Sequence, residues 1–216
     1  MPTDAPPSTA AIPRPSGRVF VLVGAALVAA GAVAVLAGRV LGRAPEPPRL
    51  SVLPDFRLTE RSGRALSLAD LRGRPWVADF IFTQCGGACP AMTARLARLR
   101  REIPMDVAFV SFTVDPAHDT PEVLARYAAT FHADGSWHFV TGAQKDLYDL
   151  SVGGFKLAAM EVPAGERAVG GDGPFLHSSK FVLVDGEGVL RGYYDSTDEP
   201  AMRALVADAA LLRAEH

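Results

Sequence analysis

Cysteine is scarce in this sequence: the chain of 216 residues contains only Cys85 and Cys89. The two lie in the stretch FTQCGGACPAMT, with three residues between them. A disulfide that stabilises a fold usually closes a long loop, because its effect grows with the number of residues enclosed. A bridge across so few residues gains little stability, so a purely structural role is disfavoured. Metal binding or reversible thiol chemistry explains the spacing better.

The sequence also lacks a large excess of one charge. No run of like charges occurs, and the formal net charge is −2. A protein that binds nucleic acid through its phosphates usually carries a basic patch or stripe. The composition therefore gives no electrostatic case for nucleic-acid binding. Only three of the basic residues are lysines. Together with abundant alanine and glycine, this arginine bias is typical of a bacterial protein.

Charge is absent altogether from residues 19–38, VFVLVGAALVAAGAVAVLAG, which lie between Arg18 and Arg39. A helix of this length covers the hydrocarbon core of a bilayer, which is about 30 Å thick. We therefore expect a transmembrane anchor at 19–38. The preceding residues 1–17 are rich in proline and small polar residues, which predicts a disordered tail.

The alternative for this segment is a cleaved signal peptide, whose apolar region usually has only about 7–15 residues. Ala32-Val33-Ala34 resembles a cleavage site but lies inside the apolar run, so the length favours an uncleaved anchor. Arginines flank the run on both sides, so the positive-inside rule does not decide the orientation. Residues 39–51 contain a proline-rich stretch and are predicted to be a linker.

From residue 52 to 216 the pattern alternates between strands and helices, which predicts one α/β domain with a central sheet flanked by helices. Two continuous apolar runs, 75–82 and 105–115, are typical of strands buried on both faces. Thr120 is expected to cap a helix that continues through Phe131. The remaining predicted elements are a hairpin over 56–68, a helix from Pro90, a strand over 137–142, a short helix over 143–151, strands over 180–185 and 189–195, and a last helix ending near Arg213.

The cysteine pair itself follows a buried strand and lies at the start of a helix. Thiolates at a helix N-terminus are stabilised by free N–H groups, so we expect thiol pKa values below about 8.5. Residues four apart on a helix have Cβ atoms about 5–6 Å apart, farther than the roughly 3.8 Å of a disulfide. With Cys85 still in the loop, both a metal-bound and a disulfide state are accessible. Soft thiolates favour Cu(I), and imidazole suits copper in either oxidation state.

Three sequence blocks extend this pattern: DFIFTQCGGACPAMT, VSFTVDPAHDTPEVLARYA and LHSSKFVLVDGEGVLRGYYD. In order and spacing they resemble the signature blocks of the Sco/SenC family, over about residues 50–212. The resemblance implies a thioredoxin-like fold, copper binding and a tether to the bacterial inner membrane, with the C-terminal domain outside the cytoplasm. One departure is Gly86, where the family commonly has proline after the first cysteine. The ligand spacing is kept.

The resemblance also selects His177 as a third copper ligand beside Cys85 and Cys89. The other four histidines are expected to have ordinary structural or surface roles. Asp115 and Asp119 in DPAHDT suit a turn and helix cap at a strand-to-helix loop. Because their block resembles the family's, the alternative is a role in orienting the site or supporting partner docking.

Three function classes remain at this point. The first is delivery of copper, as Cu(I) or Cu(II), to the dinuclear copper centre of a cytochrome oxidase, as the resemblance implies. Its partners would be a copper-accepting oxidase subunit and other copper chaperones or thiol reductants. The second is a thiol–disulfide oxidoreductase that keeps another protein's cysteines reduced. A redox or copper sensor is a further alternative, whereas the spacing of Cys85 and Cys89 argues against a peroxidase.

Overall fold

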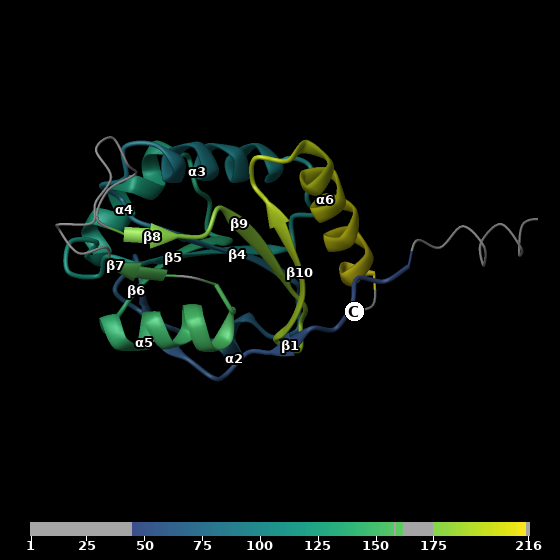
Figure 1. The fold of residues 1–216 in the computed structure, drawn as a ribbon, viewed down its shortest axis with the longest axis horizontal. Coiled ribbons are helices and arrows are strands. Elements are labelled where there is room, and N and C mark those ends of the chain that lie inside the picture. Colours follow the sequence, from purple (N-terminus) through teal and green to yellow (C-terminus); the bar gives the residue numbers. More distant parts are fainter. Residues whose placement is uncertain (1–44, 158, 162–174, 215–216) are drawn as a thin grey trace, which may run out of the picture. The chain divides into compact units, whose positions relative to one another are not determined.

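A mixed sheet of eight strands forms the centre of the structure, which is a computed structural model describing residues 45–157, 159–161 and 175–214 (Figure 1). The predicted tail, the span at 19–38 and residues 39–44 of the predicted linker lie outside these ranges. No helix within the described ranges is long and apolar enough to cross a bilayer. Residues Glu46–His216 pack together as one unit.

The strand order of the sheet is β1-β10-β9-β4-β5-β6-β2-β3. The central strands β4, β5 and β6 are parallel, and the flanking strands join antiparallel. The strands are β1 (Ser51–Val52), β2 (Arg57–Glu60), β3 (Ala65–Ser67), β4 (Trp76–Ile81), β5 (Ala108–Thr113), β6 (Trp137–Thr141), β9 (Lys180–Val184) and β10 (Val189–Asp195). A separate two-stranded sheet pairs β7 (Ala159–Glu161) with β8 (Phe175–His177).

Helices cover both faces of the sheet, as the buried parallel strands require. Every residue of β4 and β5 is buried. Figure 1 shows α3 and α6 on one side of the sheet and α2 and α5 on the other, and α4 packs into the same apolar cluster as α3 and α6. The helices are α2 (Leu68–Leu71), α3 (Ala88–Leu99), α4 (Pro121–Thr130), α5 (Gln144–Tyr148), a π-helix (Asp149–Gly154) and α6 (Glu199–Arg213).

The predicted elements are present, with shifts at their ends. The hairpin turns at Gly63, which has a positive φ of 81°. Thr120 caps α4 through a hydrogen bond from the Val123 amide to its hydroxyl, at 3.4 Å. The helix expected from Pro90 begins at Ala88, and the short helix over 143–151 continues as a π-helix. The sequence pattern did not predict β1, β7, β8 or α2, because elements of two to four residues show no periodicity.

Arg191, a residue of β10 that is only 3% exposed, binds the segment before β1 to the sheet by hydrogen bonds. Its Nε and Nη2 donate to the carbonyl of Pro47, at 3.0 and 2.7 Å. Its Nη1 donates to the buried carboxylate of Asp185 at 3.0 Å. The Leu50 amide also donates to the carbonyl of Leu190. Contacts with the domain therefore begin several residues before position 52.

One carboxyl group is fully buried in β4, on the face of the sheet that packs against α3. The hydroxyl of Ser111, opposite it on β5, donates to Asp79 Oδ1 at 2.6 Å. The indole of Trp137 donates to the same hydroxyl at 3.0 Å. Asp79 Oδ2 has no hydrogen-bond partner within the described part of the chain. Burial raises the pKa of Asp79 to about 7, although the Ser111 hydrogen bond opposes this shift.

Asp79 is expected to make stability depend on pH. Between pH 3.8, its ordinary pKa, and about 7, the carboxyl keeps its proton in the folded chain and loses it in the unfolded chain. The free energy of unfolding therefore falls as pH rises through this window, by about 4 kcal/mol at most. Asp79→Asn should remove most of this fall and be more stable than the wild type at pH 8. Urea titrations at pH 5 and 8 measure both effects.

Asp106→Asn is the matched control, because Asp106 is exposed and its pKa is lowered, chiefly by the hydrogen bond from Arg213. Its titration is complete below pH 5, so this variant should keep the wild-type difference between pH 5 and 8. If Asp79→Asn also keeps that difference, the assignment of the pH dependence to Asp79 is wrong.

Candidate metal and thiol site

The cysteines lie where the sequence predicted, on either side of a helix start. β4 ends at Ile81, and the chain then forms a short loop that contains Cys85. Gly87 is the N-cap of α3, which places Cys89 in the first helical turn. Pro90 follows in the same turn, where a missing N–H costs nothing because no carbonyl is available to accept it. The buried strand and the helix start therefore fix both ends of the loop.

The two thiols face each other across this loop. Both are reduced in this structure. The amide of Cys89 donates to Sγ of Cys85 at 3.4 Å, and the two side chains interact with each other. Cys85 is 5% exposed and Cys89 is fully buried. The arrangement brings two sulfur atoms together, which can either bind a soft metal ion or form a disulfide.

The expectation of a lowered thiol pKa is wrong for Cys89. Burial raises the pKa of this thiol, and a hydrogen bond involving the Phe82 backbone offsets only part of the shift. The neighbouring Cys85 and Asp79 raise the pKa further. Desolvation of a thiolate at Cys89 thus raises the pKa by more than the helix N-terminus lowers it. A cation between the sulfurs would reverse this balance, because a coordinated thiol loses its proton.

Asp119 joins the loop of Cys85 to the neighbouring strand. Its carboxylate is fully buried and accepts hydrogen bonds from the amide and hydroxyl of Thr83, at 3.1 and 2.5 Å. It also accepts from the hydroxyl of Thr113, at the end of β5, at 2.5 Å. Thr83 is two residues before Cys85, so this carboxylate fixes the part of the loop that leads to Cys85.

Asp115 contributes through its backbone to the turn before α4. Its carbonyl accepts the amides of His118 and Asp119, at 3.2 and 2.9 Å. Its own amide donates to the Thr113 hydroxyl at 3.0 Å. Thr120 is the residue that caps α4, so neither aspartate is the N-cap. The turn interpretation therefore holds for Asp115, whereas Asp119 makes longer-range contacts.

The backbone of His177 ends β8, where it is paired with Ala159. Three residues later the chain enters β9, which is antiparallel to β4. The start of β9 therefore lies at the edge of the sheet where β4 ends, the edge that carries Cys85. Among the described side chains, which do not include that of His177, no three histidine, cysteine, aspartate or glutamate side chains gather as metal ligands.

Several polar residues around the pair had no signal in the sequence. The hydroxyl of Thr93 donates to the Cys89 carbonyl and contacts the hydroxyl of Tyr127, both at 2.9 Å. His118, which was expected to have an ordinary role, has Nδ1 3.1 Å from Asp119 Oδ1. The contact between Thr93 and Tyr127 joins residues 34 positions apart, so no local motif reveals it.

The sequence is similar to a family of known proteins. The family model described as SCO1/SenC matches residues 44–210. A protein of Stutzerimonas stutzeri, named as a candidate copper-binding protein, is 32% identical over 150 residues, which cover 68% of this chain and 70% of that protein.

Two solved structures share the fold. A SCO1/SenC family lipoprotein from Bacillus anthracis is 31% identical, with a TM-score of 0.69 over 79% of this chain and 99% of the other. BsSco, a Sco family cytochrome c oxidase assembly protein with a disulfide switch, is 29% identical, with a TM-score of 0.67 over 80% and 99%. The fold is thus thioredoxin-like, and on the family match and these similarities the chain belongs to the SCO1/SenC family.

Proposed function

We propose that this protein binds copper through Cys85, Cys89 and His177 and delivers it to the dinuclear copper centre of a cytochrome c oxidase during assembly. One observation carries the proposal: two reduced thiols face each other at a helix start, at the sheet edge where the chain enters β9. Family membership supports it, since relatives include a candidate copper-binding protein and an oxidase assembly protein.

The chemistry of the donors agrees with copper. Thiolate sulfur is a soft ligand that selects Cu(I), and an imidazole ligand also accepts Cu(II). The cysteine thiols must lose their protons when the metal binds, and the raised pKa of Cys89 makes this loss depend on the metal. An imidazole from the segment before β9 would close the open side between the sulfurs. His177 is the residue of that segment whose chemistry fits.

A redox cycle of the same pair is the second part of the proposal. On oxidation, Cys85 and Cys89 form one S–S bond and release two protons and two electrons, which reduce a disulfide of a partner protein to two thiols. The reverse reaction restores the dithiol that copper needs. The disulfide switch of BsSco favours this reading. The alternative functions, a dedicated thiol–disulfide oxidoreductase or a redox sensor, would use this cycle without His177.

Asp119 would act as a positioning residue for Cys85. Its buried carboxylate fixes Thr83 by two hydrogen bonds, and Thr83 leads directly into the cysteine loop. Charge-assisted hydrogen bonds of this kind are strong, so they would keep the loop in one conformation. Asp115 would support the same site indirectly, by forming the turn that presents Asp119.

The membrane part of the proposal rests on the sequence and on the family. The uncharged run at 19–38 would anchor the chain in the bacterial inner membrane as a single span. The copper-binding domain would lie on the outer side of that membrane, where the family resemblance implies that it works. The Bacillus anthracis relative is a lipoprotein, which agrees with a membrane tether.

Copper titration of the reduced full-length chain in mild detergent tests the metal site. We expect one equivalent of Cu(I) per chain, measured against a competing chelator. His177→Ala should lower the affinity by about tenfold or more, equivalent to about 1.4 kcal/mol. It should also remove most of the increase in melting temperature that copper gives, because that increase depends on affinity.

His138→Ala is the matched control, because His138 lies on β6 beside Glu60 and has no ligand or positioning role in this proposal. Asp119→Asn should reduce the affinity less than His177→Ala does, since it acts through the loop. If His177→Ala binds copper as tightly as the wild type, His177 is not a ligand and the oxidoreductase function is favoured instead.

Counting free thiols tests the redox cycle. In the unfolded chain, the number of thiols that react with a colorimetric reagent should fall by two after mild oxidation and return after reduction. His177→Ala should leave this change nearly intact, because the disulfide needs only the two sulfurs. A count that stays constant under oxidants of a range of potentials would contradict the redox role.

A topology reporter tests the anchor. Alkaline phosphatase fused after residue 216 should be active, because this enzyme requires export to fold, whereas a reporter that works only in the cytoplasm should be inactive at the same position. The membrane fraction should retain the full-length chain after a wash with sodium carbonate. The opposite reporter pattern would place the domain in the cytoplasm and overturn this part of the proposal.

A further inference from the structure

A groove runs along α3 away from the cysteine pair. Its first part has a volume of about 230 Å³, starts at Ala88 beside Cys89 and is bordered by Ser179 and Thr197 on the opposite side. Its second part, of about 320 Å³, continues between α3 and α6 as far as Glu102. Both parts are lined by Arg95 and Arg98, so they adjoin each other along α3, and the two together are called the groove.

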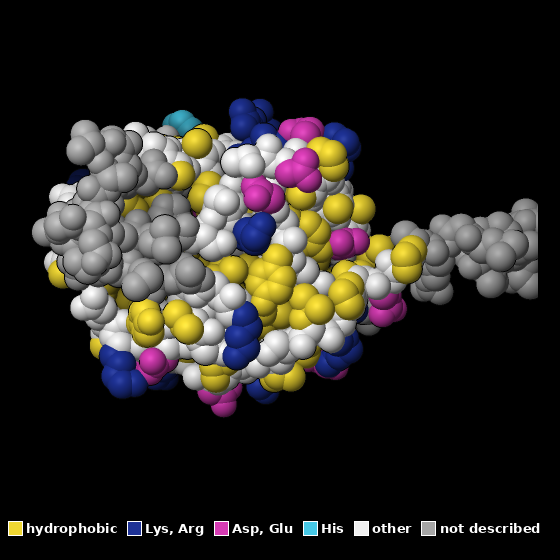
Figure 2. All heavy atoms as spheres, viewed as in Figure 1, with side chains coloured by type: hydrophobic (Ala, Val, Ile, Leu, Met, Phe, Trp, Pro, Cys, Tyr) yellow, Lys and Arg dark blue, Asp and Glu magenta, His cyan; other side chains and the backbone are white. Residues whose placement is uncertain are grey.

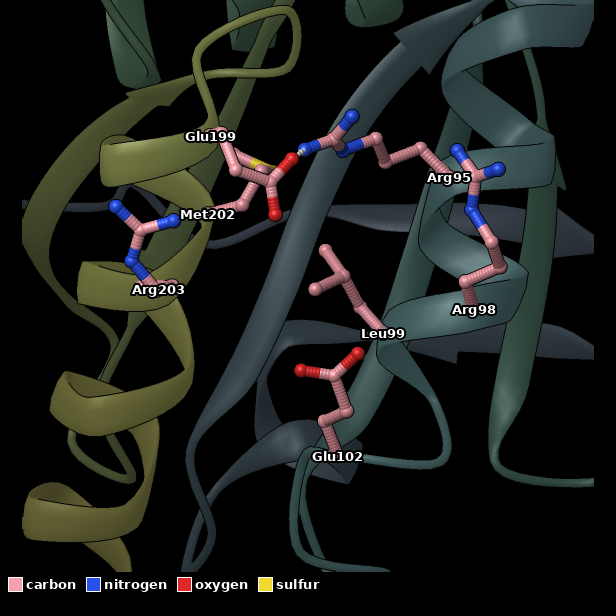
Figure 3. Close-up of a pocket in the computed structure, with 7 residues that line it drawn as sticks. All are labelled: Arg95, Arg98, Leu99, Glu102, Glu199, Met202 and Arg203. Atoms are coloured by element: carbon pink, nitrogen blue, oxygen red, sulfur yellow. Dashed lines mark hydrogen bonds and ion pairs between the residues drawn. The ribbon is translucent and has the colours of Figure 1, made fainter.

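The floor of this groove is apolar and its walls are charged. Leu99 from α3 and Met202 from α6 lie at its base, and both are almost fully buried. Figure 3 shows Arg95 reaching from α3 toward Glu199 on α6, with which it forms an ion pair. In Figure 2 basic and acidic side chains gather at the upper edge of the molecule, where α3 and α6 lie.

The arginines of the groove outnumber its acids. Arg95, Arg98 and Arg203 face only Glu102 and Glu199. The sequence of α3 contains no acidic residue. Glu199 already neutralises Arg95, whereas Arg98 and Arg203 are exposed and have no carboxylate partner within the described part of the chain. The groove therefore carries unsatisfied positive charge next to a buried reactive pair.

We propose that this groove binds an extended acidic segment of the protein that exchanges copper or thiols with the cysteine pair. The proposal rests on the proposed function, because it supplies the docking surface for that exchange. Cys85 and Cys89 are buried, so a partner must bring its own ligand or thiol to the start of α3. Carboxylates farther along the same segment would then meet the arginines.

The helix geometry fixes where those carboxylates should be. Arg95 and Arg98 lie six and nine residues after Cys89, which is about 9 and 13 Å along the helix axis. An extended segment advances about 3.3 Å per residue. The partner should therefore carry acidic residues about three and four positions from the residue that reacts at Cys89. Glu199 holds Arg95 in the free protein and is displaced by the partner's carboxylate.

Peptide binding tests this proposal without copper or free thiols. One labelled peptide has an S-methylated cysteine followed, at the third and fourth positions, by two glutamates; a second peptide has lysines there. Fluorescence anisotropy with the full-length chain in mild detergent should show the acidic peptide binding several-fold tighter at about 20 mM salt. The preference should shrink at about 200 mM salt, because exposed charges are then screened.

Variants of opposite effect sharpen the test. Arg98→Ala should weaken binding of the acidic peptide by about three- to fivefold, as expected for an exposed charge pair. Glu199→Gln should strengthen it, because Arg95 is released. The matched control is Arg126→Ala, since Arg126 is an exposed arginine of α4 that does not line the groove.

Three results would overturn the proposal: no binding of the acidic peptide, equal binding of both peptides, or an equal loss in Arg98→Ala and Arg126→Ala. These results are independent of the copper titration. A chain that binds copper but does not distinguish the peptides refutes only the groove. A chain that distinguishes the peptides but binds no copper refutes the metal site and leaves the groove as a docking surface.

Discussion

The buried carboxylate of Asp119 is the contact on which the site depends. It accepts hydrogen bonds from Thr83, which follows β4, and from Thr113, which ends the neighbouring strand β5. A buried carboxyl group must have its hydrogen bonds satisfied in this way, since leaving it unpaired is costly. The loop that carries Cys85 is therefore held by the same group that shapes the turn before α4.

Burial gives the cysteine pair its chemical character. A thiolate at Cys89 is disfavoured by desolvation and by the nearby Asp79. A helix N-terminus offers only partial positive charge, which does not compensate here. A metal cation brings full positive charge to the two sulfurs at once. The site is thus better suited to holding a soft cation than to maintaining a free thiolate at Cys89.

Features set by local pattern could be predicted from the sequence, and features set by distant contacts could not. The continuous apolar run of β4 and the cap at Thr120 are local, and both are confirmed. Arg191 shows no signal in its neighbourhood, since its partner Pro47 lies far away in the chain. The pKa of Cys89 was misjudged for the same reason, because burial depends on packing across the sheet. His177 was selected by family resemblance, which carries information that periodicity lacks.

The hydrogen bonds between Arg191 and Pro47 limit how far the domain can lie from the proposed membrane span. With the proposed span ending at residue 38, only residues 39–46 remain between the bilayer and a fixed contact on the sheet. Eight residues extend to about 28 Å at most, and the one proline among them, Pro45, is stiff. The domain would be kept close to the membrane surface, so it would meet its target by lateral diffusion. Two proteins confined to one membrane search in two dimensions, and a weak docking surface is then sufficient.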